Sequence, residues 1–244
     1  MMATPPPLGP APQLITLDIG YTLGAPGGSS LTVVLAEDLP LPEAEARRIV
    51  QCHLHTLDVL DDETISRVSQ DLHIPAGAFP RDHRLPRFDF WPGAIEAVAE
   101  LARLLPVATL SNITRADDAA SAVAQTLRPY LSGHHPSYLL GYAKPDPRAL
   151  RAVAAAHGVS PEQIIHLGDS VECDVRTALQ AGARAVWINE WITDHPLALP
   201  AELADDAGRL HVAPTLTAAV AYVRGLLNPS TPPSPTLDNK GVVL

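Results

Sequence analysis

Short apolar runs that alternate with helical patterns are the feature of this chain that most restricts its fold. Runs typical of buried strands cover residues 13–19, 106–111, 138–140, 163–167 and 183–188, and a short edge strand is expected at 210–212. Segments with apolar residues at helical spacing lie between them, at 92–104, 115–127, 146–157, 171–181 and 214–227. This alternation predicts an α/β fold with a three-layer core, in which a parallel sheet is covered by helices on both faces.

One stretch, residues 24–90, interrupts this alternation. It is predicted to be helical at 42–60 and near 62–72, and a loop rich in Pro, Arg and His follows at 74–87. An insertion of this length directly after the first strand is longer than a connection needs to be. We therefore expect it to form a separate helical unit above the edge of the sheet.

The domain organisation follows from this insertion. We expect a core formed by residues 13–23 and 91–227, with an α-helical cap inserted at 24–90. The ends of the chain, 1–12 and 228–244, are rich in Pro, Ser and Thr and are expected to be disordered tails.

Charge and composition exclude several classes of partner. The formal net charge is −10, so the basic surface that non-specific nucleic-acid binding requires is not expected. No apolar run approaches the ~20 residues that span a bilayer, and the N-terminus lacks the features of a secretory signal. The two cysteines, Cys52 and Cys173, do not form a disulfide or metal-binding pattern. We expect a cytoplasmic monomer or homodimer that binds neither nucleic acid nor membrane.

Polar residues follow four of the expected strands. Asp18 ends the first strand, Ser111 and Asn112 end the second, and Asp169 follows the fourth, with Asp174 five residues further on. Lys144, one of only two lysines in the chain, follows the third strand. Because ligands of open parallel sheets bind beyond the carboxyl ends of the strands, these side chains are expected to share one cleft.

These residue types suit phosphoryl transfer. A carboxylate such as Asp18 can attack phosphorus and form an acyl phosphate. Magnesium, which prefers oxygen ligands and takes one or two carboxylates, would be held by Asp18 and Asp169, and Asp174 could orient Asp169 or a metal-bound water. Donors such as Ser111, Asn112 and Lys144 would bind the phosphoryl oxygens. We therefore expect a phosphorylated substrate, and a small one, because the inserted helical unit closing over the site would exclude a macromolecule.

The ordered set of motifs resembles the haloacid-dehalogenase-like hydrolase superfamily. The matching elements are an apolar strand ending in Asp18 with Thr22 four residues later, Ser111 after the second strand, Lys144 before Pro-Asp, and Gly-Asp at 168–169 with Asp174. The resemblance covers roughly residues 14–227. It implies a Rossmann-like core, a mobile cap after the first strand and magnesium as the usual cofactor, with Asp18, Gly20 (through its carbonyl), Asp169 and Asp174 at the metal. Thr22 either assists catalysis or simply hydrogen-bonds the turn that positions Asp18.

The chain departs from the family pattern at Gly20. In phosphatases of this family a second aspartate stands there, protonates the leaving oxygen and then activates water, and such a group contributes ~10² to 10⁴ in rate. Gly20 and its neighbour Tyr21 are expected to line the substrate site. A replacement acid from the cap could come from His53, His55 or His83, or the acid could be Tyr21.

Three functions remain compatible with Gly20. The first is magnesium-dependent phosphoryl transfer on a substrate whose leaving group needs little protonation. The second is hydrolysis of a carbon–halogen or carbon–phosphorus bond, because relatives that catalyse these reactions also lack that aspartate. The third is a non-catalytic binding or regulatory role. The Gly168-Asp169 pair favours the metal-dependent reaction, since metal-independent dehalogenases do not keep that motif in this form.

Overall fold

Six parallel strands form the central sheet of the computed structural model, which describes residues 9–83, 87–121, 123–190, 203, 206 and 208–228. Their order is β5-β4-β1-β6-β7-β8. The strands are β1 (Leu14–Leu17), β4 (Val107–Ser111), β5 (Gly133–Pro136), β6 (Ile164–Gly168), β7 (Arg184–Ile188) and β8 (Leu210–Ala213). The predicted Rossmann-like α/β core is thereby confirmed.

The strands at the centre of the sheet are apolar because both of their faces are covered. Every residue of β1, β4 and β6 is buried. The register pairs Ile15 with Val107 on one side and with Ile165 on the other. Continuous apolar strands are what a doubly covered parallel sheet requires.

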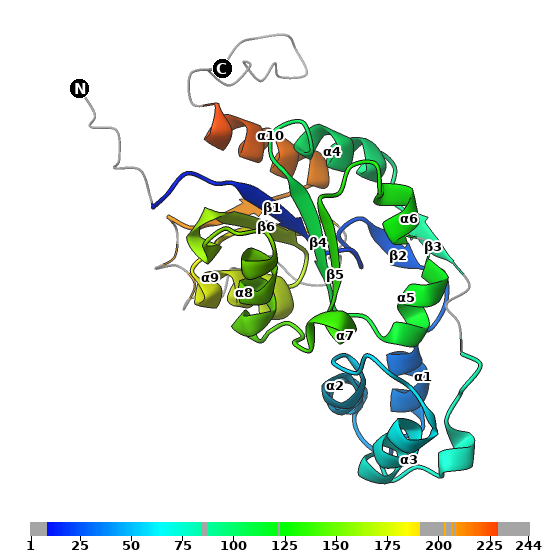
Figure 1. The fold of residues 1–244 in the computed structure, drawn as a ribbon. Coiled ribbons are helices and arrows are strands. Elements are labelled where there is room, and N and C mark those ends of the chain that lie inside the picture. Colours follow the sequence, from blue (N-terminus) through cyan, green and yellow to red (C-terminus); the bar gives the residue numbers. More distant parts are fainter. Residues whose placement is uncertain are drawn as a thin grey trace.

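Helices cover both faces of the sheet (Figure 1). On one face α4 (Ala94–Leu101), α6 (Val123–Leu127) and α10 (Leu216–Leu227) pack against the strands through one apolar cluster. On the other face α8 (Pro147–Ala156) and α9 (Arg176–Ala181) form a second cluster. A further core helix, α5 (Arg115–Ser121), lies beside the insertion (Figure 1).

The insertion at residues 24–90, called the cap segment below, has an apolar cluster of its own. Its helices are α1 (Leu31–Glu37), α2 (Glu43–Leu54) and α3 (Asp62–Asp71), and their buried side chains pack against one another. The strands β2 (Gly24–Pro26) and β3 (Phe88–Phe90) pair antiparallel where the segment leaves and rejoins the core. The boundaries of core and cap remain a prediction, which this separate cluster supports.

Several local expectations differ from the structure. Residues 138–140 were expected to form the third strand, but they lie in the short helix α7 (Ser137–Leu140), and the strand is β5, at 133–136. Three apolar residues in succession do not distinguish a strand from a buried helical turn. At β5 the pairing with β4 through the backbone decides the structure, although its sequence, Gly-His-His-Pro, has little strand character. The helix α1 and the pair β2–β3 were not expected.

The helix expected at 171–181 begins as a π-helical turn at Val171–Val175 and continues as α9. The helix expected at 115–127 consists of α5 and α6, and residue 122 between them lies outside the described residues. Most of the two predicted tails also lies outside them, at residues 1–8 and 229–244. In the described part of the chain, no helix combines the length and apolar character needed to cross a bilayer.

Candidate active site

The carboxyl ends of β1, β4 and β6 meet the cap segment around a cavity of about 690 Å³. All the site residues predicted from the sequence line this cavity except Thr22, which is fully buried beneath it. The parallel topology explains this convergence, because all strands end at the same edge of the sheet.

Lys144 links two carboxylates at the floor of the cavity. Its Nζ donates hydrogen bonds to Oδ1 of Asp18 at 2.7 Å and to Oδ1 of Asp174 at 2.5 Å. All three residues are buried. A cation buried between two anions is stable only with this close geometry, because desolvation of each charge is costly. Asp18 and Lys144, which the sequence placed in one cleft, are therefore in direct contact.

The pKa values of these groups reflect the balance between burial and charge. Burial raises the pKa of Asp18 above its ordinary value, although the Lys144 ammonium partly opposes the shift. Burial alone would also raise the pKa of Asp174, but Lys144 and a hydrogen bond from His166 hold it below its ordinary range. Burial would lower the pKa of Lys144, but Asp174 and Asp18 raise it. Lys144 is therefore charged at neutral pH.

The sequence did not single out His166, which hydrogen-bonds Asp174 and helps to hold it in place. This histidine lies inside β6 and is fully buried, with Nε2 3.0 Å from Oδ1 of Asp174 and Nδ1 2.8 Å from Oγ1 of Thr16. In the neutral ring Nε2 donates to the carboxylate and Nδ1 accepts from the hydroxyl. Thr16 and His166 are paired polar residues in two otherwise apolar strands, and this pattern could have identified His166 from the sequence.

Gly168 is required by the position of Asp174. A Cβ at Gly168 would lie 2.2 Å from Cγ of Asp174, so any side chain there would displace the carboxylate. The backbone N–H of Ser170 donates to Oδ2 of Asp174 at 3.0 Å. With Lys144 and His166 on Oδ1, both oxygens of Asp174 are engaged, which favours an orienting role over direct metal ligation.

Asp169 lies beside Asp18 and is held by two neighbours. Thr22 donates from Oγ1 to Oδ1 of Asp169 at 3.1 Å, and Trp187 donates from Nε1 to its carbonyl oxygen at 2.7 Å. Thr22 therefore positions this carboxylate. Burial, followed by the charges of Asp18 and Asp174, raises the pKa of Asp169 to about 7. An anion in this position requires a positive partner to remain ionised at neutral pH.

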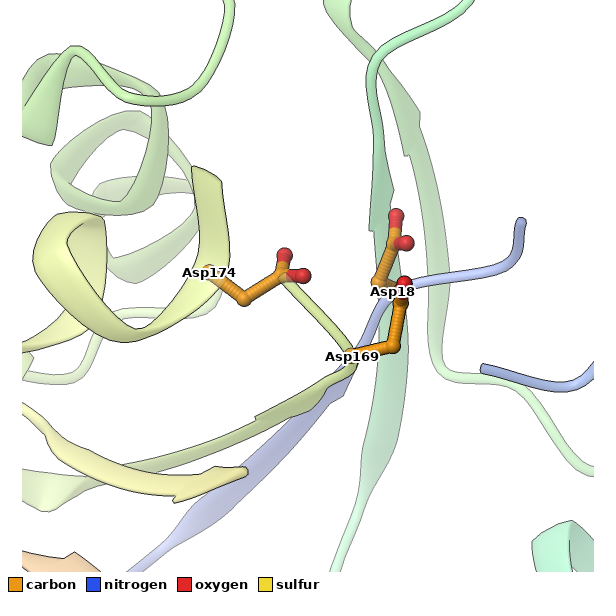
Figure 2. A group of neighbouring side chains, drawn as sticks. All are labelled: Asp18, Asp169 and Asp174. Atoms are coloured by element: carbon orange, nitrogen blue, oxygen red, sulfur yellow. The ribbon is translucent and has the colours of Figure 1, made fainter. Parts of the chain in front are cut away.

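The three aspartates form a group that could hold a metal ion. One carboxylate oxygen from each of Asp18, Asp169 and Asp174 lies within 4.8 Å of the others. Figure 2 shows the three side chains converging from two strand ends and the π-helical turn. Oxygen donors of this kind suit magnesium. Burial, and then the charges of Asp18 and Asp174, raise the pKa of Asp169, and a cation would oppose both effects. The donor set therefore fits the predicted cofactor.

A protein-family comparison decides the affiliation of the chain. The family model of the haloacid dehalogenase-like hydrolases matches residues 53–182, slightly more than half of the chain. The chain belongs to this family. The match includes Ser111, Lys144, Asp169 and Asp174 but begins after Asp18, so the position of Asp18 rests on the geometry above.

Individual relatives of this hydrolase include enzymes of two kinds. A phosphoserine phosphatase from Thermus thermophilus is 35% identical over 152 residues, which cover 58% of this chain and 57% of the relative. The chain therefore matches little more than half of that protein's length. Among solved structures, a 2-haloacid dehalogenase from Pseudomonas syringae has a TM-score of 0.59 at 19% identity, covering 87% of this chain and 98% of that one. A phosphatase from Thermococcus onnurineus has a TM-score of 0.53 at 17% identity, covering 87% and 98%. The structures agree in fold.

Ser111 and Asn112 of the hydrolase lie at the end of β4. Ser111 is buried and lines the cavity. The Asn112 side chain binds the backbone of Lys144: Nδ2 donates to its carbonyl oxygen at 2.6 Å and Oδ1 accepts from its N–H at 2.8 Å. Asn112 thus fixes the loop that carries Lys144. The sequence did not indicate this contact, which accounts for the position of Asn112 better than the expected substrate binding does.

Gly20 and Tyr21 form the edge of the cavity next to Asp18. A Cβ at Gly20 would have no atom within 4 Å, so the missing carboxylate leaves open space. Tyr21 has a φ of +57°, is exposed, and accepts a hydrogen bond on its carbonyl from Nε1 of Trp91 at 3.4 Å. The open space shows that glycine is not imposed by packing at position 20.

Four residues were candidates for the missing acid, and the structure separates them. His55 and Tyr21 line the cavity, whereas His53 lies near Asp71 at 3.6 Å and His83 binds Asp117 at 3.0 Å. Burial lowers the pKa of His55 to about 4, so this ring is neutral at pH 7 and a poor proton donor. The sequence did not single out Arg47 and Gln51, which precede His55 at intervals of four residues along α2 and also line the cavity.

Proposed function

We propose that this hydrolase cleaves small phosphorylated molecules through a phosphorylated Asp18. The observation that carries the proposal is the contact between Asp18 and Lys144, in a cavity that also contains Ser111 and Asp169. A nucleophilic carboxylate, a cation and a hydroxyl donor are the groups that phosphoryl transfer requires. The 35% identity to the phosphoserine phosphatase supports a phosphorylated substrate.

The proposed reaction has two displacements. A carboxylate oxygen of Asp18 attacks phosphorus, the bond from phosphorus to the leaving oxygen breaks, and that oxygen departs with the electron pair. Water then attacks the phosphorus of the aspartyl phosphate, releases phosphate and regenerates Asp18. Lys144 and Ser111 donate to the phosphoryl oxygens, and Asp174 with His166 keeps Lys144 in place.

Magnesium is the proposed cofactor. Asp18 and Asp169 would hold it together with the carbonyl of Gly20, and it would supply positive charge between the nucleophile and the phosphate. Thr22 keeps Asp169 at the cavity edge. Asp174 would act on the metal only through its neighbours, because its oxygens already accept from Lys144, His166 and Ser170.

The glycine at position 20 limits the leaving group. No side chain is present there to protonate a departing oxygen, and His55 is neutral. Acyl phosphates and phosphates of acidic phenols leave as stable anions, whereas an alkoxide does not. We therefore propose acyl or aryl phosphates as the preferred class, in contrast to an alkyl ester such as the one in the relative's name.

Arg47 extends this specificity to the other end of the substrate. Arg47, on α2 of the cap segment, lines the same cavity as Asp18, and its ion-pair partner Glu43 is exposed. Exposed ion pairs are weak, so an anionic group of the substrate can replace Glu43. We infer that the substrate carries a second anionic group, such as a carboxylate.

A substrate panel tests the proposal. With magnesium present, acetyl phosphate, 4-nitrophenyl phosphate, phenyl phosphate and an alkyl phosphate are compared for wild type, Asp18→Asn and Asp146→Asn. We expect turnover to fall steeply along that series, to vanish in Asp18→Asn and to persist in Asp146→Asn, since Asp146 binds Arg148 outside the cavity. Equal background rates for wild type and Asp18→Asn on every phosphate would refute phosphatase activity.

Dehalogenation is the second candidate, and Gly20 is the observation that favours it. In that reaction a carboxylate oxygen of Asp18 attacks the carbon, the carbon–halogen bond breaks, and halide leaves without a proton. Halide release from 2-haloacids without magnesium, dependent on Asp18, would establish this function in place of the first. The metal-binding arrangement of Asp169 beside Asp18 favours the phosphatase.

A further inference from the structure

Asp117 is a further buried acid at the wall of the cavity, separate from the three clustered aspartates. It belongs to α5 of the core and is only 2% exposed. Its carboxylate accepts from the backbone N–H of Leu31 at 3.1 and 3.3 Å, from Nε2 of His83 at 3.0 Å and from Oγ1 of Thr114 at 2.8 Å. Three different segments of the chain therefore meet at one side chain.

Two of these donors belong to the cap segment. Leu31 is the first residue of α1, and a backbone N–H at a helix start has no partner within its helix. His83 lies near the other end of the cap segment, with its side chain mostly buried. A core carboxylate therefore binds the cap segment at two points 52 residues apart in sequence (83 − 31).

The start of α1 is also part of the cavity wall. Ser30, Thr32 and Val33 line the cavity on either side of Leu31. Thr32 links α1 with α2, because its Oγ1 lies 2.8 Å from Nε2 of His55 at the end of α2. Hydrogen bonds thus connect Asp117 with the start of α1, and the start of α1 with the end of α2.

A second link between cap and core, the ion pair of Arg115 with Asp58, is exposed to solvent. Arg115, two residues before Asp117, donates from Nη1 to Oδ1 of Asp58 at 2.7 Å, but both side chains are more than half exposed. An exposed pair of this kind contributes little stability, whereas a buried carboxylate that accepts several hydrogen bonds contributes much more. The buried link at Asp117 is therefore the stronger of the two.

We propose that Asp117 is a positioning residue that fixes the cap wall over the active site by binding Leu31 and His83. It touches neither the metal ligands nor the phosphate position, and it acts through α1. An asparagine cannot replace it, because its single amide oxygen faces three donors and its amide N–H groups would oppose them. The consequence for catalysis rests on the proposed function, but the effect on the cap does not.

Hydrogen exchange followed by mass spectrometry tests the effect on the cap without any substrate. We compare wild type, Asp117→Asn and the matched control Asp58→Asn, which removes the exposed link. We expect about tenfold or faster amide exchange at residues 31–37 in Asp117→Asn, with the strands of the core unchanged, and no change in Asp58→Asn. Unchanged exchange at 31–37, or an equal increase throughout the core, would overturn the proposal.

Kinetics with acetyl phosphate provide the second measurement. We expect Asp117→Asn to raise KM about tenfold and to alter kcat much less, because the wall of the site moves while the reacting groups stay. A loss of kcat at unchanged KM contradicts a positioning role. If wild type turns over none of the phosphates, the proposed function fails, and hydrogen exchange alone decides the role of Asp117.

A second variant covers the case in which Asp117→Asn does not fold. His83→Ala removes one donor from the cap segment and leaves the contact between Asp117 and Leu31. Faster exchange at residues 79–83 together with a raised KM would support the proposal. Exchange at the wild-type rate in this segment would count against it.

Discussion

Lys144 donates a hydrogen bond from Nζ to Oδ1 of Asp18 at 2.7 Å, although 126 residues separate the two in sequence. The same ammonium binds Asp174, so one cation serves two buried anions. This arrangement places a cation against the proposed nucleophile, and the cation partly opposes the rise in the pKa of Asp18 that burial causes. Removal of the Lys144 charge should therefore lower the free energy of unfolding, because it leaves two buried carboxylates without their cationic partner.

Replacement of Lys144 by methionine should therefore destabilise the fold. Two buried carboxylates would lose their cation, and loss of one partner from a buried ion pair costs about 3–5 kcal/mol. Urea unfolding measures the change. Arg148→Met is the control, because the Arg148 side chain is exposed in its ion pair with Asp146 and its removal should change the midpoint much less. Equal midpoints for Lys144→Met and wild type would contradict the assigned balance of charges.

Gly20→Asp should restore proton transfer to the leaving group. A Cβ at Gly20 would meet no atom within 4 Å, so a side chain can begin there without a clash. We expect turnover of phenyl and alkyl phosphates to rise about 10²-fold, and that of acetyl phosphate to change little, because only poor leaving groups need the acid. Gly20→Asn has the same size without the acid and should give no gain. A similar gain in both variants would indicate a change of shape and not proton transfer.

Magnesium should stabilise the protein through Asp169. A ligand at about one hundred times its dissociation constant adds about 2.7 kcal/mol to the free energy of unfolding. Urea unfolding with magnesium or with EDTA measures this difference. We expect it in wild type and in Asp146→Asn but not in Asp169→Asn, because that variant loses one of the two proposed carboxylate ligands. The same magnesium effect in Asp169→Asn would remove Asp169 from the metal site.

Arg47→Met should weaken binding of substrates that carry a second anionic group. Loss of a charge-assisted hydrogen bond is expected to raise KM about tenfold for a carboxylate-bearing phosphate and to leave KM for phenyl phosphate unchanged. Arg48→Met is the matched control, since Arg48 adjoins Arg47 on α2 and is exposed. If both variants affect both substrates alike, then Arg47 does not read the anionic group.

Acid should destabilise the cap segment through His55. Burial lowers the pKa of His55 to about 4 in the folded protein, whereas the unfolded chain has the ordinary value of 6.5. Below pH 6.5 the unfolded state therefore takes up a proton that the folded state does not, and stability falls until about pH 4. The loss from this residue is on the order of 3 kcal/mol.

The His55→Gln variant isolates this contribution, because glutamine can still hydrogen-bond Thr32 but does not titrate. Unfolding is measured between pH 4 and 7 for both proteins. We expect the difference in stability between wild type and variant to shrink or reverse as the pH falls, since other groups, such as His135, contribute equally to both. A difference that does not depend on pH would contradict the lowered pKa.

The sequence predicted the core well because the core depends on short-range patterns. The apolar runs at 106–111, 163–167 and 183–188 became β4, β6 and β7 within a residue or two. Prediction failed where tertiary pairing decides the structure. The strand β5 contains Gly-His-His-Pro and forms because β4 offers an unpaired edge, and β2 and β3 pair across 61 residues of the cap segment.

Residue types and their spacing alone established which chemistry is available: Asp18, Ser111 and Asp169 at strand ends, Lys144 before Pro-Asp, and glycine at position 20. The tertiary structure decided how these groups are used. It placed Lys144 between two carboxylates and His166 in hydrogen-bond contact with Asp174. It directed Thr22 to Asp169 and Asn112 to the backbone of Lys144. It also brought Arg47 and Asp117 to the cavity. Burial and charge over a few ångströms govern such roles, and these quantities depend on segments that are far apart in the chain.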